Sequence, residues 1–226
     1  MATVNEFVTT AQHQIGYKEE GTNITKYSKD FDTTYWQFFN TKKQGAEWCS
    51  IFVHWCAVKT IGKDKTLKFF GETPKTNAAA GVGYFWDYLK AKGYKSSAAN
   101  AKMGDIIFFK NTKGISHVGI VEKVDSKNII SIEGNKSNSV KRCTHSKTSS
   151  TIYGVMSPTW SQFDTTDSGK TNSKVATAAV IEQIARDCIK GKYGTYPLRK
   201  QKVNALGYGS IYTQVQKRVN MILYGR

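Results

Sequence analysis

The stretch GAEWCSIFVHWC, residues 45–56, is almost entirely apolar and aromatic, yet it carries two cysteines seven positions apart. Apolar side chains on most sides predict a buried helix over about residues 47–61. Cys49 and Cys56 share one face of it but differ in depth. Cys49 lies in the first turn, where unpaired N–H groups and the helix dipole favour a thiolate. The pattern leaves Cys49 open as core thiol or nucleophile and favours a core thiol for Cys56.

The elements around this helix predict an α+β domain. Residues 4–15 have apolar side chains at helical spacing, and FWDYLKAKG (85–93) predicts a shorter amphipathic helix. Four later runs are short, rich in β-branched and aromatic residues and separated by turn residues: GDIIFFK (104–110), HVGIVEKV (117–124), NIISIEG (128–134) and TIYGVMS (151–157). Such runs predict an antiparallel sheet, and helices followed by strands indicate the α+β class.

A change of composition divides the chain. Residues 158–174, PTWSQFDTTDSGKTNSK, are poor in aliphatic side chains, which predicts a linker. We therefore expect one domain over residues 1–157. Periodic apolar positions in VATAAVIEQIARDCIKGKYG and IYTQVQKRVNMIL predict a small three-helix domain over residues 175–226.

Composition narrows the function. The net charge of +16 favours a polyanionic partner, but only 5 of the 33 basic residues are Arg, which disfavours base-specific recognition of nucleic acid. We expect no membrane partner, because no long apolar span is present. The first residues lack the basic and apolar regions of a secretory signal, so we expect synthesis in the cytoplasm. Four cysteines without paired spacing predict free thiols and no zinc site.

A cysteine nucleophile needs a base, and the sequence contains four histidines. His54 follows Cys49 by five residues, about 140° around the helix, so the two side chains diverge. His13 lies off the apolar stripe of the first helix and His145 lies in the predicted polar loop KRCTHSKTSS, and both are interpreted as solvated surface residues. His117 opens a predicted strand, and we expect Gly119 beside it to leave room for a substrate.

The base in turn needs a group that fixes its tautomer. Strand alternation places Ser131 and Glu133 on one face, so that a carboxylate ends the strand one hairpin after His117. Taken singly, Glu133 is interpreted as a surface carboxylate and Asn135 as a turn residue. The order Cys, His, Glu, Asn is much less expected by chance.

At this point the motifs resemble a known family. WCSIFVHW, MGDIIFF, SHVGIVEKV and IEGN, over roughly residues 5–157, are similar to the CHAP domains of bacterial wall hydrolases, the cysteine, histidine-dependent amidohydrolases and peptidases. The resemblance implies a papain-like (NlpC/P60-like) fold with a central helix on an antiparallel sheet. It also implies that Cys49 is the nucleophile, His117 the general base, Glu133 the orienting residue and Asn135 a fourth polar member.

The tail resembles a second family. IARDCIKGKYG, Arg199 and YTQVQKRVN are similar to the CW_7 cell-wall-binding repeat, in a single copy over about residues 175–226. The resemblance implies wall-binding roles for Tyr193, Arg199, Gln216 and Arg218. TYP follows KYG where typical repeats differ, so we expect another helix connection here.

Together these resemblances imply a phage endolysin that is made in the host bacterial cytoplasm, is released at lysis and acts on peptidoglycan. The expected reaction is amide cleavage through a Cys49 thioester, and the sequence leaves open an N-acetylmuramoyl-L-alanine amidase or a peptidoglycan endopeptidase. The alternative is a non-catalytic wall-binding protein with an inactive site. A marginal core in the tail also suggests a homo-oligomer formed through the C-terminal domain.

Further side chains complete the expected site. Backbone N–H groups at the helix start would meet the oxyanion, with Gln44 or Tyr27 as a nearby polar group and Trp48 beside the substrate groove. The chemistry requires no metal or cofactor. DFDTTYW, with Asp30, Asp32 and Tyr35, partly resembles the calcium loop of some CHAP domains, although it lies farther upstream of the cysteine.

Overall fold

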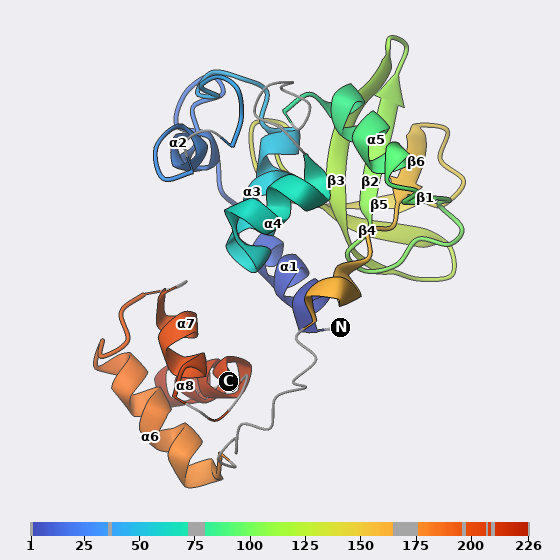
Figure 1. Ribbon diagram of the computed structural model, residues 1–226. Coiled ribbons are helices and arrows are strands. Elements are labelled where there is room, and N and C mark those ends of the chain that lie inside the picture. Colours follow the sequence, from blue (N-terminus) through green and yellow to red (C-terminus); the bar gives the residue numbers. More distant parts are fainter. Residues whose placement is uncertain are drawn as a thin grey trace. The chain divides into compact units, whose positions relative to one another are not determined.

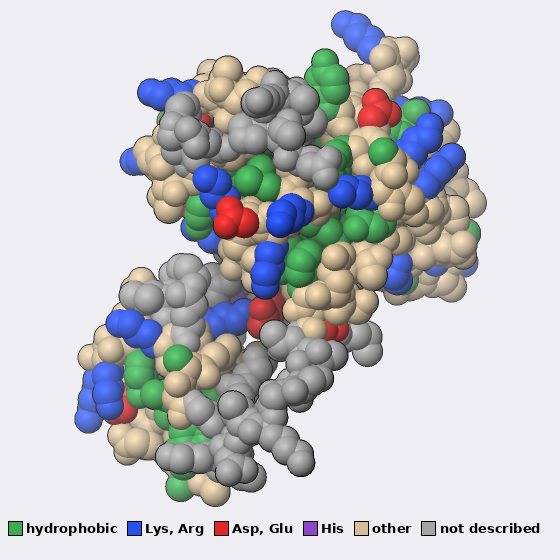
Figure 2. Space-filling view, viewed as in Figure 1, with side chains coloured by type: hydrophobic (Ala, Val, Ile, Leu, Met, Phe, Trp, Pro, Cys, Tyr) green, Lys and Arg blue, Asp and Glu red, His purple; other side chains and the backbone are tan. Residues whose placement is uncertain are grey.

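The computed structural model describes residues 2–35, 38–71, 80–164, 176–195, 198–206, 208 and 211–225. The chain divides into two compact units, Met1–Asp164 and Thr165–Arg226, called here the N-terminal and C-terminal units (Figure 1). Lys and Arg side chains are spread over the visible face of both units (Figure 2). No helix among the described residues is long and apolar enough to cross a membrane.

The N-terminal unit combines helices with an antiparallel sheet, which confirms the α+β prediction. Its helices are α1 (Ala2–Gln12), α2 (Lys26–Asp32), α3 (Cys49–Ile61), α4 (Lys63–Phe70), α5 (Val82–Ala91) and the 3₁₀ helix η1 (Trp160–Phe163). Its strands are β1 (Lys95–Ser96), β2 (Ile106–Asn111), β3 (Gly114–Val124), β4 (Asn128–Glu133), β5 (Lys141–Ser146) and β6 (Ile152–Met156). They pair in the order β1-β6-β2-β3-β4-β5.

One face of the sheet packs against the helices, which gather on that side (Figure 1). Alternate strand residues such as Phe108, Ile120 and Ile132 join the core that also contains α1, α3 and α5. Residues 49–58 of α3 are all buried, so the helix needs apolar side chains around its whole circumference. This explains why GAEWCSIFVHWC is so uniformly apolar.

The other face of the sheet curls over a smaller apolar cluster that includes Ile107, Phe109 and Val121. The rings of Phe109 on β2 and His145 on β5 lie 4.5 Å apart, although β3 and β4 separate these strands in the sheet. A register shift at Phe109 and Lys110 leaves Ser116 as an extra residue next to His117. Such bulges bend a strand and change the direction of its side chains.

Several local predictions were wrong or incomplete. The stretch containing residues 141–146 was predicted to be a polar loop but forms β5, an edge strand with little apolar alternation. Helices α2 and α4 were not predicted. The predicted linker begins too early, because Trp160 packs on Phe7 and its indole donates a hydrogen bond to the carbonyl of Gly104 at 2.9 Å. Residues 165–174 of that linker lie outside the described residues.

The described residues of the C-terminal unit form α6 (Ala178–Ile189), α7 (Leu198–Asn204) and α8 (Tyr212–Tyr224). Thr177 caps α6 by accepting a hydrogen bond from the backbone N–H of Val180, and Gly225 ends α8 in the left-handed conformation. A separate apolar core contains Ile184, Ala185, Cys188, Val203, Val215 and Val219.

Candidate active site

Cys49 is the first residue of α3. Its N-cap, Trp48, makes no capping hydrogen bond through its side chain, and 6% of Cys49 is exposed. Cys56, two turns deeper, is fully buried, and burial raises the pKa of its thiol well above the ordinary value. The structure therefore distinguishes the two cysteines: Cys49 begins the helix and interacts with a histidine, described next, whereas Cys56 is a core thiol.

That histidine is His117 on β3. Its Nε2 lies 3.0 Å from Oε2 of Glu133, and His117 also forms a hydrogen bond with Cys49. Burial lowers the pKa of His117, but the hydrogen bonds with Cys49 and Glu133 outweigh burial and raise the pKa to about 9. His117 therefore carries a proton at neutral pH, and a protonated imidazole stabilises a thiolate at the sulfur that it contacts.

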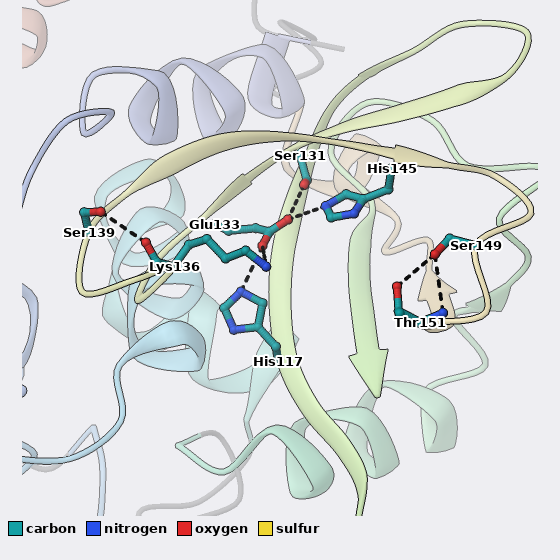
Figure 3. Close-up of polar contacts among 8 residues, drawn as sticks. All are labelled: His117, Ser131, Glu133, Lys136, Ser139, His145, Ser149 and Thr151. Atoms are coloured by element: carbon teal, nitrogen blue, oxygen red, sulfur yellow. Dashed lines mark hydrogen bonds and ion pairs between the residues drawn. The ribbon is translucent and has the colours of Figure 1, made fainter. Parts of the chain in front are cut away.

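Glu133 is fully buried and accepts hydrogen bonds on both carboxylate oxygens (Figure 3). Oε1 lies 2.6 Å from the hydroxyl of Ser131 and 2.6 Å from Nε2 of His145. Oε2 faces His117 and lies 3.6 Å from Nζ of Lys136. Burial raises the pKa of Glu133, but the hydrogen bonds from His117, His145 and Ser131 outweigh it and hold the pKa well below its usual range. Glu133 is therefore a carboxylate, oriented toward His117.

Gly119 makes room for this carboxylate. A Cβ at position 119 would lie 2.7 Å from Cγ of Glu133, which is closer than real Cβ contacts. The expectation that Gly119 leaves space for a substrate was wrong, because the side chain of Glu133 fills that space. The glycine instead allows the acid of β4 to reach His117 across the strand pair.

His145 corrects a second prediction. It was interpreted as a solvated surface residue, but its side chain is only 16% exposed and contacts Glu133 and Phe109. The pairing of β4 with β5 sets Cys143 opposite Ser131 and His145 opposite Ile129, on the face that carries Glu133. The i, i+2 spacing of Cys143 and His145 was the available signal, but the strand around them has too little hydrophobic alternation to be recognised.

The other histidines lie away from this cluster. His13 is exposed on the segment that follows α1. His54 is fully buried, with Nδ1 2.8 Å from the carbonyl of Ser50 and Nε2 3.2 Å from that of Phe70. Burial lowers the pKa of His54 to about 4. It is a neutral core residue, in agreement with its exclusion as the base.

Asn135 does not lie in the line formed by Cys49, His117 and Glu133. Its Nδ2 donates to Oε2 of Glu47 at 2.5 Å and approaches Oδ1 of Asn23 at 3.5 Å. Its backbone is left-handed, with φ of 59°, which Asn tolerates better than most residues. Asn135 therefore links the turn after β4 to the segment just before α3. Sequence reasoning missed Asn23 and Glu47, because neither belongs to a recognisable motif.

The three side chains expected at the oxyanion site and the groove differ in their surroundings. Tyr27 and Trp48 are fully buried, and their rings pack 5.6 Å apart. The side chain of Gln44 accepts from the N–H of Thr25 and donates to its carbonyl, at 3.0 and 3.2 Å. Tyr27 and Trp48 thus lie in the core, whereas Gln44 is exposed and its amide is bonded to the backbone of Thr25. The backbone N–H groups at the start of α3 are candidate oxyanion donors.

The calcium-like motif does not fit a calcium ion. Asp30 accepts a hydrogen bond from the indole of Trp55 at 2.8 Å and pairs with Lys59 at 2.9 Å. Asp32 accepts hydrogen bonds from two backbone N–H groups, at 2.6 and 3.0 Å. A calcium cage needs several oxygens that converge without such donors. Within the described residues, one group offers ligand atoms close enough for a metal, namely Glu133, Cys143 and His145, all within 4.8 Å of one another.

The structure separates the four residues suggested for wall binding. Tyr193 is buried in the core of the C-terminal unit. Nε of Arg199 donates to the carbonyl of Gly194 at 2.8 Å, and Gln216 bonds to Tyr212 and Asn220 along α8. Arg218 forms an ion pair with Glu182, on the rim of a mainly apolar groove between α6 and α8. Of the four, only Arg218 lines that groove.

The comparisons with known proteins agree with this division. Residues 41–135 match the CHAP domain family, and residues 182–223 match the CW_7 repeat. No curated protein and no solved structure shows a significant match to the chain. CHAP domains are generally cysteine, histidine-dependent amidohydrolases or peptidases, and Cys49, His117 and Glu133 all lie in the matched region. The chain thus combines a region similar to a CHAP domain with one similar to a CW_7 repeat, a combination that suggests peptidoglycan hydrolysis and binding to the cell wall.

Proposed function

We propose that the protein hydrolyses an amide bond of bacterial peptidoglycan through a thioester on Cys49. The observation that carries this proposal is the continuous line from Cys49 through His117 to the buried carboxylate of Glu133. A nucleophile, a base and an orienting acid in hydrogen-bond sequence are the minimum set for cysteine acyl transfer. The thiol at a helix start and the histidine on the sheet support the proposal, because a papain-like site would need both.

The proposed reaction has two halves. The Cys49 thiolate attacks the scissile carbonyl, and N–H groups at the start of α3 stabilise the oxyanion. The protonated His117 then gives its proton to the leaving amine, and the acyl group remains on sulfur. In the second half, neutral His117 takes a proton from water, hydroxide attacks the thioester, and the thiolate leaves. Glu133 stabilises the imidazolium in both halves, and no step requires a metal or cofactor.

The decisive test compares the wild type with Cys49→Ala on purified Gram-positive cell walls. We expect turbidity to fall with the wild type and to stay constant with Cys49→Ala. Cys56→Ala is the matched control, because it removes a thiol from the same helix face two turns deeper. We expect it to retain activity with a stability loss of about 1 kcal/mol. Wall clearing by Cys49→Ala would reject the nucleophile.

The released fragments decide which bond is cut. Fragments in which the muramoyl lactyl group is free of peptide would identify an N-acetylmuramoyl-L-alanine amidase, and new peptide termini would identify a peptidoglycan endopeptidase. Both activities are open, because the same acyl chemistry serves both.

We also propose that the protein is a phage endolysin, synthesised in the host bacterial cytoplasm and acting on the wall after lysis. A hydrolase region joined to a wall-binding region supports it.

We propose that the C-terminal unit holds the enzyme on the wall through the groove between α6 and α8. The groove has a volume of about 620 Å³ and is lined by residues that include Ile181, Glu182, Arg218 and Met221. Apolar walls with charged groups at the rim suit a peptide or sugar ligand. Residues 175–226 contain nine basic and two acidic residues, which adds attraction to an anionic wall polymer.

Arg218→Ala tests this role by sedimentation with walls, in a Cys49→Ala background that prevents hydrolysis. We expect binding to weaken by about tenfold, a loss typical of a buried or rim arginine that contacts a ligand. Lys192→Ala is the control, because Lys192 belongs to the same unit but pairs with Asp187 outside the groove. Equal binding by Arg218→Ala and Lys192→Ala would show that the wall-binding site lies outside this groove.

A second candidate function is a non-catalytic wall-binding protein with an inactive site. It predicts that the wild type sediments with walls and releases no fragments.

Self-association is a further proposal, supported by the apolar side chains of Met221, Leu223 and Tyr224 on α8, which are exposed. Sedimentation equilibrium at several protein concentrations would show it directly.

A further inference from the structure

The carboxylate of Glu133 is held from two sides by two histidines of different strands (Figure 3). Oε2 faces His117 on β3, at 3.0 Å. Oε1 faces His145 on β5, at 2.6 Å, and accepts from Ser131 as well. Because a carboxylate only accepts hydrogen bonds, Nε2 of His145 carries the proton in this contact. The two oxygens therefore have separate partners, and the partners of Oε1 fix which oxygen faces His117.

His145 is itself held in place. Its side chain is 16% exposed, and its ring lies 4.5 Å from that of Phe109. The same Phe109 ring lies 5.9 Å from His117. One aromatic side chain thus contacts both histidines, one on each side of the acid. A residue that is anchored in this way can transmit a fixed orientation to the group that it bonds.

We propose that His145 is a positioning residue of the active site: its N–H holds Oε1 of Glu133 so that Oε2 stays directed at His117. The proposal rests on the proposed function, in which His117 is the base. It adds a residue that lies beyond the stretch 41–135 matching the CHAP family. Truncation of His145 would leave a buried carboxylate free to turn, held by Ser131 alone on that oxygen.

The same atoms also allow a metal site, and the structure favours positioning. Cys143, His145 and Glu133 offer a sulfur, a nitrogen and an oxygen within 4.8 Å. However, Oε1 already has donors in Ser131 and His145, and the ammonium of Lys136 lies 3.6 Å from Oε2. Protons and a nearby cation thus satisfy the buried anion without a metal ion.

The test uses the full chain and the variants His145→Ala and His145→Gln, with His13→Gln as a control for loss of an exposed histidine. Gln retains an N–H close to the position of Nε2, whereas Ala has none. The first readout is the alkylation rate of Cys49 by iodoacetamide across pH, followed on the Cys49 peptide by mass spectrometry. This readout needs no substrate, so it tests His145 even if the wall-hydrolase proposal fails. The second is the pH profile of wall clearing.

Within the described residues, the charged and titratable groups that face the cluster include Cys49 on α3, His117 on β3, Glu133 on β4, Lys136 after β4, and Lys141 and Cys143 on β5. In the wild type we expect the rate of wall clearing to fall on the alkaline side of its pH profile near pH 9, where His117 loses its proton. This fall is called the alkaline limb. For His145→Ala we expect clearing, and alkylation at pH 6, to fall by about tenfold, and the alkaline limb to move to lower pH. His145→Gln should retain the wild-type limb and rates within about threefold.

Four results would overturn the proposal. His145→Ala could match His13→Gln in both readouts, or its alkaline limb could move to higher pH. Equal losses in His145→Ala and His145→Gln would show that ring packing matters and the N–H does not. Loss of wild-type activity in EDTA, with recovery on adding Zn²⁺, would make His145 a metal ligand. Thermal melts of each variant separate these outcomes from misfolding.

Discussion

The region around His54 and the region around His117 show how differently one side chain behaves in two parts of the same domain. Both imidazoles are withdrawn from water, and burial alone lowers a histidine pKa. The nitrogens of His54 face two carbonyl groups, and burial outweighs these contacts and lowers the pKa to about 4. At His117, hydrogen bonds with Cys49 and Glu133 overcome burial, and the pKa rises to about 9.

The difference teaches that the hydrogen-bond partners of an imidazole, here Cys49 and the buried carboxylate of Glu133, and not its proximity to the cysteine in sequence, raise its pKa. His54 lies five residues from Cys49, and His117 lies 68 residues away. The nearer histidine is on the wrong side of the helix and faces only neutral partners. The distant one contacts the thiol because β3 passes the start of α3, and it retains a proton because β4 brings an acid beside it.

Removal of that acid should reduce the difference in pKa between His117 and His54. We therefore expect the largest loss of wall clearing from Glu133→Gln. The amide keeps the shape of the side chain but loses the charge, so the pKa of His117 should fall. Wall clearing should drop by up to about 10⁴-fold, the loss seen when the orienting acid of a catalytic triad is made neutral. Turbidity assays with the wild type as reference measure this, and retention of full activity would contradict the orienting role.

The same variant should change how stability depends on pH. His117 has a folded-state pKa of about 9 against an ordinary value of 6.5, so its contribution is fully present below pH 6.5 and is lost as pH rises through 9. The excess stability of the wild type over Glu133→Gln should therefore be larger at pH 6 than at pH 9.5. Urea denaturation at both pH values measures it, and a difference that does not change with pH would contradict the ion pair.

The smallest effect on catalysis is expected from His54→Gln, which changes the other region. The amide can still donate a hydrogen bond in the core, but it loses ring packing on Phe85, whose centroid is 4.4 Å away. We expect a stability loss of about 1–2 kcal/mol and a rate of wall clearing at 25 °C close to that of the wild type. A thermal melt and a clearing assay measure the two quantities. A loss of activity that exceeds the loss of folded protein would indicate that His54 takes part in the reaction.

Part of the site was predictable because it depends on local periodicity. A helix that begins near Cys49 follows from the apolar run, and the shared face of Ser131 and Glu133 follows from strand alternation. Part was not, because it depends on curvature. His145 reaches Glu133 because β5 pairs with β4, but it reaches Phe109 on β2 only because the sheet curls, and β5 carries little apolar alternation to reveal its face. Aromatic residues close to the cysteine in sequence were also misleading: Tyr27 and Trp48 pack inward, where burial of their rings stabilises the core.

By itself the sequence determined the α+β class and the position of each cysteine along its helix, because these follow from short-range spacing. Its resemblance to CHAP domains implied which residues are the candidate nucleophile, base and acid. Only the tertiary structure decided that Gly119 makes room for the acid, that Asn135 bonds away from the line, and that His145 holds the other end of Glu133. The physical reason is that hydrogen bonds of a buried carboxylate are selected by strand pairing and sheet curvature. These join residues that no local pattern connects.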